Sequence, residues 1–187
     1  MKNILILNGS PSGDQGNCAV WIKLIKKHLG SEAVTEVVHL SKGTALAKKK
    51  IVLADGVIFV TGTYWDSWGS PLQKFFEDST DLEGTAALMG KPAAVFVLMH
   101  SVGGKGILSR LQGVLSTLGF LIPPMCGMVY SLVSDVALKS KNSHAKDFWQ
   151  KEDISLILKN FLKACDLEIQ WAVWPVDKKN PQRRWLK

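Results

Sequence analysis

A loop of small polar residues follows the first apolar run of the chain. Residues 4–7 are Ile and Leu, and residues 8–18 are dominated by Gly, Ser and Asn before an apolar-periodic stretch begins. The predicted order is strand, loop, helix, which directs backbone N–H groups and hydroxyls toward an anion at the helix N-terminus, usually a phosphate. The loop matches neither GxxxxGKS/T nor GxGxxG, so it does not indicate an NTPase. A tight turn without a ligand is the alternative.

Two further loops have side chains suited to a planar ligand. Tyr64, Trp65 and Trp68 lie in the polar stretch 62–69, and Gly103 and Gly104 lie in the glycine-rich stretch 100–106. Aromatic faces and edges pack against a flat ring, and glycine allows the backbone to approach it closely. Core or interface packing is the alternative for the aromatic side chains. Three of them in one connecting loop favour binding.

Alternating strands and helices must position these loops. We expect strands at 4–7, 34–40, 56–61 and 92–99, with a short fifth strand at 120–122 continuing over 125–130. Helices are expected from Asn17 as N-cap to Gly30, within 41–53, from Ser70 as N-cap, over 107–118 and over 154–165. Residues 131–147 are predicted as a loop.

This alternation predicts an α/β fold with helices on both faces of a doubly wound parallel sheet. We expect five strands in the order 2-1-3-4-5 and one domain over residues 1–187, with a C-terminal tail from about residue 166 that holds Trp171, Trp174 and Trp185. Ligands of such sheets bind at the carboxyl ends of the strands, where the strand order reverses. The three loops follow strands one, three and four, so they are predicted to converge on one pocket.

Composition narrows the class of protein. Cys18, Cys126 and Cys165 are far apart and form no CxxC pair, so we expect no metal site and no disulfide framework, and a cytoplasmic location. No apolar run approaches the length of a membrane span, and the N-terminus has no signal-peptide core, so no membrane association is expected. The net charge of +7 suits anionic ligands. Since no nucleic-acid motif accompanies it, no nucleic-acid partner is expected.

Spaced motifs give the chain a family resemblance. They are NGSP at 8–11, GN at 16–17, ADGVIF at 54–59, YW at 64–65, GKPA at 90–93 and SVGG at 101–104. In this order they resemble the flavodoxin-like NAD(P)H-dependent FMN reductases over residues 1–130. The resemblance implies a flavodoxin-like fold, non-covalent FMN, and NADPH or NADH as reductant. It also implies transfer of electrons to a quinone, azo, nitro or similar small-molecule acceptor.

The resemblance also implies which residues bind FMN. The phosphate would lie on Ser10, Ser12, Asn17 and Cys18, and the isoalloxazine would lie between two further groups: Thr63, Tyr64, Trp65, Asp66 and Ser67, and Ser101, Val102, Gly103 and Gly104. The flavin supplies the chemistry, so no side chain is predicted to be a catalytic acid or base. The chain departs from the family pattern at Ser12, where Arg or Lys is common, and at Cys18, Gly62, Thr63 and His100.

Other functions remain open from the sequence. An FMN-binding electron carrier and a non-enzymatic flavin- or nucleotide-binding scaffold would share these loops, although the positive charge argues against an acidic flavodoxin. A low-molecular-weight phosphatase is excluded, because no arginine follows Cys18 in its loop. The family resemblance further implies a homodimer in which a second subunit completes the flavin pocket.

Two side chains of the loops carry separate hypotheses. Cys18 at a helix N-terminus is either a thiol with a lowered pKa or a small polar stand-in for Thr. His100 is either incidental or a hydrogen-bond partner of the flavin.

Overall fold

One parallel sheet forms the centre of the computed structural model, which describes residues 1–139, 149–173 and 175. The strand order is β2-β1-β3-β4-β5, as predicted. Every pairing is parallel, with Ile6 opposite Ile58 and Val97 opposite Val129. The strands are β1 (Lys2–Asn8), β2 (Ala33–His39), β3 (Gly56–Gly62), β4 (Ala93–Met99) and β5 (Gly127–Ser131).

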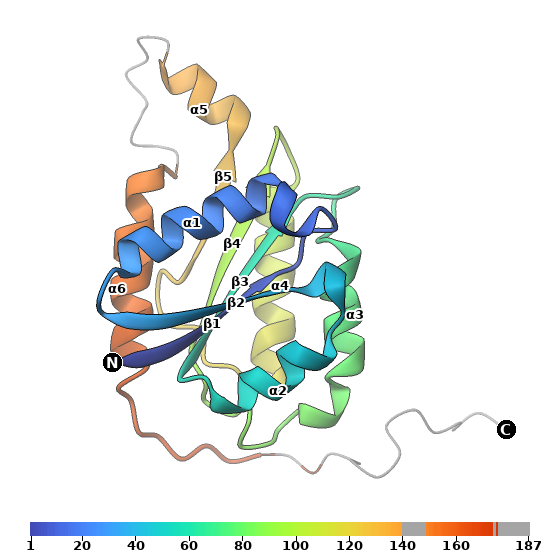
Figure 1. Cartoon of the computed structure of the whole chain (residues 1–187), viewed down its shortest axis with the longest axis vertical. Helices are drawn as coiled ribbons and strands as arrows, with labels where there is room; N and C mark the ends of the chain where they lie inside the picture. Colours follow the sequence, from blue (N-terminus) through green and yellow to red (C-terminus); the bar gives the residue numbers. More distant parts are fainter. Residues whose placement is uncertain (140–148, 174, 176–187) are drawn as a thin grey trace, which may run out of the picture.

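Helices cover both faces of this sheet (Figure 1). On one face lie α1 (Asn17–Leu29) and α6 (Ile154–Ala164), and on the other lie α2 (Ala45–Leu53), α3 (Ser70–Asp78) and α4 (Gly104–Leu118). A further helix, α5 (Leu132–Lys139), follows β5 directly. A short 3-10 turn, η1 (Gly13–Gln15), lies within the first loop, and a second, η2 (Leu40–Lys42), lies beside it.

The apolar runs form strands because both sheet faces are covered. Side chains alternate across a strand, so Ile4 and Ile6 enter the core under α1 and α6, whereas Leu5 and Leu7 enter the core under α2, α3 and α4. All four are at most 2% exposed. A strand buried on both sides needs an unbroken apolar sequence, which is the pattern that the chain shows.

Two elements near the end of the sheet differ from prediction. The stretch 131–147 was predicted as a loop, but residues 132–139 form α5, and residues 140–147 lie outside the described part of the chain. Leu132, Val133 and Val136 are exposed, so they gave no pattern of a buried helical stripe. The fifth strand begins only at Gly127. Residues 120–122 form no strand apart from one isolated bridge from Leu121 to Pro92, since the prolines at 123 and 124 cannot donate to a ladder.

Glycines replace the predicted N-caps of two helices. Gly16, with φ −98° and ψ 178°, precedes α1, and Asn17 is the first helical residue instead of the cap. Gly69 likewise precedes α3, so Ser70 is helical. A Cβ on Gly69 would lie 2.2 Å from the carbonyl oxygen of Gly9, which explains why a residue with a side chain does not occupy this cap. Gly30 ends α1 as predicted, with its N–H donating to the Lys26 carbonyl.

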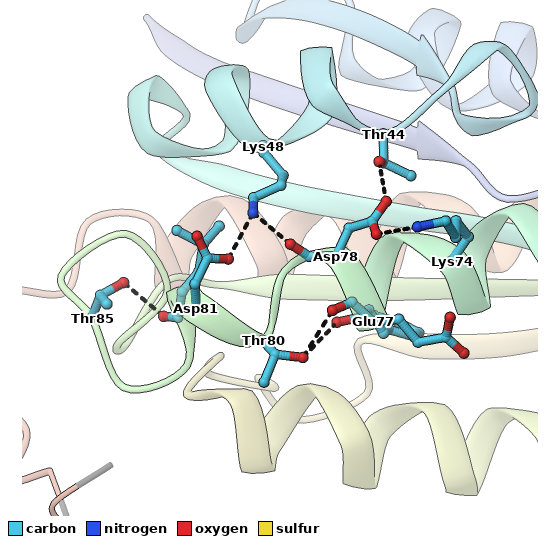
Figure 2. A network of polar contacts seen from close by, with 10 residues as sticks. Thr44, Lys48, Lys74, Glu77, Asp78, Thr80, Asp81 and Thr85 are labelled. Carbon is cyan, nitrogen blue, oxygen red and sulfur yellow. Dashed lines mark hydrogen bonds and ion pairs between the residues drawn. The ribbon is translucent and has the colours of Figure 1, made fainter. Parts of the chain in front are cut away.

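A polar network holds α3 to α2 (Figure 2). The Thr44 hydroxyl and the Lys74 ammonium both donate to the Asp78 carboxylate, and these hydrogen bonds, first from Lys74 and then from Thr44, lower the pKa of Asp78. Lys48 donates to the Asp78 carbonyl and, at 2.7 Å, to the Asp81 carboxylate. The network fixes the direction of α3, whose first turn continues from the aromatic loop.

The described part of the tail runs along the amino ends of the strands, opposite the three loops (Figure 1). There the Trp171 indole lies so close to Gly90 that a Cβ on this glycine would be 2.5 Å from Nε1. Trp174 and Trp185 lie outside the described residues. Within the described ranges, none of the helices combines the length and apolarity needed to cross a bilayer.

Candidate functional site

Direct contacts bring the three predicted loops together at the carboxyl edge of the sheet. The Gly9 N–H donates to the Val60 carbonyl at 2.8 Å, and the hydroxyls of Ser10 and Tyr64 are 2.8 Å apart. The Thr63 N–H donates to the Leu98 carbonyl at 2.9 Å. The first loop therefore contacts the second, and the second contacts the end of β4, from which the third loop emerges.

Asn8 at the end of β1 organises the first loop. Its Nδ2 donates to the Gly13 carbonyl at 2.7 Å and lies 3.0 Å from Nδ1 of His39, while its Oδ1 accepts from the Ser10 N–H at 3.0 Å. The side chain is fully buried, so the loop is fixed from beneath by an amide whose hydrogen bonds are made within the protein. In the sequence analysis Asn8 belongs to the motifs of the family resemblance but not to the predicted site residues. The signal that could have identified it is an amide side chain at the end of a buried strand, directly before Gly9 and Ser10.

The first loop fits a phosphate group. Its donors are hydroxyls and backbone N–H groups ahead of α1: Ser10 is 2% exposed, and Ser12 and Asn17 are exposed at the rim. A Cβ on Gly16 would lie 2.8 Å from Cβ of Ser12 and 3.6 Å from Oγ of Ser10, so a side chain at 16 would fill the hollow that these residues surround. Neutral donors at a helix N-terminus suit a phosphate ester.

Cys18 is a buried neutral thiol. Only 3% of the residue is exposed, and burial raises its thiol pKa to about 12, outweighing the Ser10 hydroxyl, whose hydrogen bond acts in the opposite direction. The hypothesis of an activated, oxidisable thiol is therefore wrong, because such a thiol needs a lowered pKa and access to solvent, and Cys18 has neither. Its side chain acts as a small packing group beside Ser10.

A strained turn forms the tip of the second loop. Tyr64 and Ser67 exchange backbone hydrogen bonds of 2.8 and 3.0 Å, which leaves Trp65 and Asp66 as the central residues of a two-residue turn. Both have left-handed backbone conformations, with φ of 48° and 56°. Turns of this kind favour Asn-Gly, and a bulky residue at positive φ is uncommon. The Trp65 side chain is fully exposed.

Arg110 of α4 holds this turn in place. Its guanidinium donates to the Asp66 carbonyl and lies 5.6 Å from the ring centroid of Trp68. Nε1 of Trp68 in turn donates to Oε1 of Gln73 on α3 at 3.0 Å. These contacts tie the aromatic loop to two helices. Sequence reasoning did not single out Arg110, which lies 44 positions away from Asp66 in the chain.

The third loop packs closely against the second. Gly103 has φ +86°, and a Cβ there would lie 2.4 Å from a carboxylate oxygen of Asp66. Ser101 and Val102 are exposed beside it, and Gly104 begins α4 against Val129. These contacts place the backbone of 101–104 beside the strained turn. The His100 carbonyl accepts from the Val133 N–H at 3.0 Å, so this residue has a defined backbone role in the start of α5.

The meeting point of the loops is an open rim. The Tyr64 ring lies across Gly62, where a Cβ would be 3.1 to 3.3 Å from ring and hydroxyl atoms, and its hydroxyl reaches the first loop. Two hollows of the described surface lie away from this meeting point: one of about 560 Å³ lies between η2 and α3, and one of about 450 Å³ lies at the amino edge beside Trp171. A ligand on the rim would keep one side open to solvent.

Comparison with protein families decides the classification. Residues 2–131 match the model of the family described as NADPH-dependent FMN reductase. The chain belongs to this family. The cofactor of this family is FMN, and a nicotinamide nucleotide is the reductant of the flavin. No curated protein sequence matches the chain.

Solved structures share the fold of this FMN reductase family member. FerB, a flavoenzyme NAD(P)H:(acceptor) oxidoreductase from Paracoccus denitrificans, is 17% identical with a TM-score of 0.67 and covers 89% of this chain and 98% of its own. The apo form of the NADH:FMN oxidoreductase EMOB is 19% identical with a TM-score of 0.67, covering 90% and 92%. A Fusobacterium nucleatum flavodoxin bound to flavin mononucleotide is 17% identical with a TM-score of 0.51, covering 65% and 69%.

Proposed function

We propose that this chain is an FMN-dependent oxidoreductase that takes hydride from NADPH or NADH and passes electrons to a quinone, azo, nitro or similar small-molecule acceptor. The observation that carries the proposal is the convergence of the three loops at one edge, through the Ser10–Tyr64 hydrogen bond and the contact of Asp66 with Gly103. Membership of the FMN reductase family supplies the cofactor and the reductant.

The residues divide into two groups in this proposal. The hydroxyls and N–H groups of the first loop hold the phosphate ester, at the positive end of α1. Thr63 to Ser67 and Ser101 to Gly104 lie along the isoalloxazine. When bound, FMN supplies the two-electron chemistry that links the nicotinamide to the acceptor. Backbone N–H groups of the third loop would stabilise negative charge on the reduced ring.

The open rim supports exchange of two substrates at one ring face. A flavin reductase must release the oxidised nicotinamide before the acceptor approaches the same face, and a rim allows both to enter from solvent. The net charge of +7 favours anionic nicotinamide nucleotides in general and the additional phosphate of NADPH in particular.

Absorption spectroscopy tests the proposed function. The purified protein is mixed with FMN, desalted, and treated with NADPH or NADH in the same anaerobic cuvette. We expect a flavin band that remains with the protein and bleaches on adding the nicotinamide, and reoxidises when a naphthoquinone is added. Retained flavin that bleaches only with dithionite would contradict an NAD(P)H-dependent enzyme and support an electron carrier or a scaffold. Absence of retained flavin at excess FMN would contradict FMN binding itself.

We further propose a homodimer. Leu132, Val133 and Val136 of α5 expose apolar side chains next to the carboxyl end of β5, on the side of the molecule that holds the loops. Burial of this helix against a second copy would remove apolar surface from water. Light scattering at micromolar concentration tests this proposal, and a monomer mass would overturn it.

We propose a cytoplasmic location because the cysteines form no disulfide. Cys18, Cys126 and Cys165 are all free thiols, as expected for a protein from a reducing compartment. Fractionation of cells that produce the protein tests this location.

A further inference from the structure

The hydroxyls of Ser10 and Tyr64 form a hydrogen-bonded pair between two loops that are 54 positions apart in the chain. The distance between their oxygens is 2.8 Å. Ser10 is buried, and Tyr64 is half-buried at the rim of the site. The resemblance places Tyr64 beside the flavin ring, whereas its hydroxyl lies on the phosphate loop.

A count of protons shows what this pair can offer a ligand. Each hydroxyl has one proton to donate, and Oγ of Ser10 already accepts from the Ser12 N–H at 3.2 Å. One proton forms the bond between the two hydroxyls, so the other remains free for a further acceptor, whichever residue is the donor. The neighbouring Cys18 competes weakly for this proton, because sulfur is a weak acceptor and the thiol is neutral. A hydroxyl that donates to another hydroxyl also polarises it, which strengthens the outward bond to an anion.

The first loop has no positively charged side chain that could bind the phosphate. Residues 9–18 contain neither Lys nor Arg. Lys42 reaches the loop from η2, but its ammonium pairs with the Asp14 carboxylate at 3.1 Å. Recognition of a doubly charged phosphate ester therefore depends on hydroxyls and backbone N–H groups.

Gly62 allows Tyr64 to reach this position. A Cβ on residue 62 would lie 3.1 Å from Cε2 of Tyr64 and 3.2 Å from its hydroxyl oxygen, so the ring lies flat across the end of β3. A larger residue would lift the ring and carry the hydroxyl away from Ser10. The glycine at 62 and the tyrosine at 64 thus work as a unit.

We propose that Tyr64 and Ser10 act as one donor pair for the phosphate group of the flavin nucleotide, with Tyr64 as a phosphate-site residue. The inference rests on the proposed function, since it assigns a role within the same site. It predicts that the Tyr64 hydroxyl contributes to the affinity for FMN and not to the affinity for riboflavin, which has the same ring and no phosphate.

Dissociation constants of Tyr64→Phe for FMN and for riboflavin, measured by quenching of flavin fluorescence, test this inference. We expect the dissociation constant for FMN to rise about tenfold, because a hydrogen bond to a charged group is lost, while that for riboflavin changes less than about twofold. Equal losses for both flavins would overturn the inference and leave the proposed function intact. Tighter binding of FMN would also overturn it, since the phenol would then obstruct the site. A wild-type protein that binds neither flavin would overturn the proposed function and the inference together.

The other tyrosine provides a matched control. Tyr130→Phe removes the same atom from β5, and we expect the ratio of the two dissociation constants to stay at the wild-type value. A change in this ratio as large as that of Tyr64→Phe would overturn the assignment to Tyr64.

A double-mutant cycle tests whether the two hydroxyls act as a pair. Ser10→Ala combined with Tyr64→Phe should weaken FMN binding about as much as the more damaging single substitution. Fully additive losses would show that the residues act independently and would overturn the pair. Gly62→Ala gives a second route if Ser10→Ala does not fold: displacement of the intact Tyr64 should weaken the binding of FMN more than that of riboflavin, and equal losses for the two flavins or an unchanged dissociation constant for FMN would count against the pair.

Discussion

The first and second loops differ in how their conformations are maintained. Small residues form the first loop, and hydrogen bonds within it fix its backbone: Asn8 bonds both Ser10 and Gly13, and the Ser12 N–H donates to Oγ of Ser10. The second loop carries Trp65 and Asp66 at positive φ, and the distant Arg110 holds it. The first loop is thus already shaped to bind, whereas the second is a strained turn that surrounding elements force to display an aromatic ring. Strain of this kind concentrates at functional sites.

Gly69→Ala should have the largest effect, because it separates the two loops. The added Cβ would lie 2.2 Å from the Gly9 carbonyl oxygen, which belongs to the backbone of the first loop and has no flexible side chain to yield. We expect the free energy of unfolding to fall by about 3 kcal/mol, measured by urea denaturation, with loss of FMN binding.

Gly113→Ala is the matched control for that substitution. Gly113 lies in α4 with nothing within 4 Å of its Cβ position, so the same change should stabilise the protein by about 0.8 kcal/mol. If both variants have equal stability, the close approach of the two loops is not maintained in solution.

Replacing Trp65-Asp66 by Asn-Gly should relax the second loop. The new pair suits a turn with positive φ at both positions, so we expect the free energy of unfolding to rise by about 1.5 kcal/mol in urea denaturation. The dissociation constant for riboflavin should rise about fivefold, because an aromatic contact worth about 1 kcal/mol is lost. Asp66→Gly alone should give part of this gain in the free energy of unfolding and leave the dissociation constant for riboflavin unchanged. A double variant that gains no stability would show that the turn is unstrained.

The buried thiol of the first loop makes stability depend on alkaline pH. The folded-state pKa of Cys18 is about 12 against an ordinary value of 9.0, so its contribution is complete below pH 9 and is lost as the pH rises toward 12. At pH 10 wild type should have lost about 1.4 kcal/mol more than Cys18→Ala, relative to pH 7. Urea denaturation at both pH values measures this difference, in which the shared effects of Cys126 and Cys165 cancel. Parallel losses in the two proteins would contradict a buried neutral thiol.

Asp14→Asn should have the smallest effect. Asp14 and Lys42 form an exposed ion pair in which Lys42 lowers the pKa of Asp14 chiefly through the hydrogen bond, and such pairs contribute little. At about 0.15 M ionic strength we expect the dissociation constant for FMN to change less than about twofold. A larger change, measured by fluorescence titration, would mean that the freed Lys42 takes part in the first loop and that this loop does not rely on neutral donors alone.

The local sequence pattern was sufficient to predict the first four strands and the positions of the three loops. Unbroken apolar runs such as 56–61 indicate strands buried on both faces, and the parallel strand order follows from alternation with helices together with the family resemblance. Helix α5 was missed because Leu132, Val133 and Val136 are exposed and leave no stripe that matches a core. The start of β5 was misplaced because Phe120 is buried without belonging to a strand.

The sequence by itself therefore determined the fold class, the three loops, and the chemical types available at their meeting point, since these depend on residue type and short-range order. Only the tertiary structure decided that the Tyr64 hydroxyl lies on Ser10, that Arg110 holds Asp66, and that Cys18 is a neutral thiol. Each of these depends on the direction in which a side chain points or on its burial away from water. Contacts between residues that are distant in the chain determine side-chain direction and burial, and the local sequence pattern carries no information about those contacts.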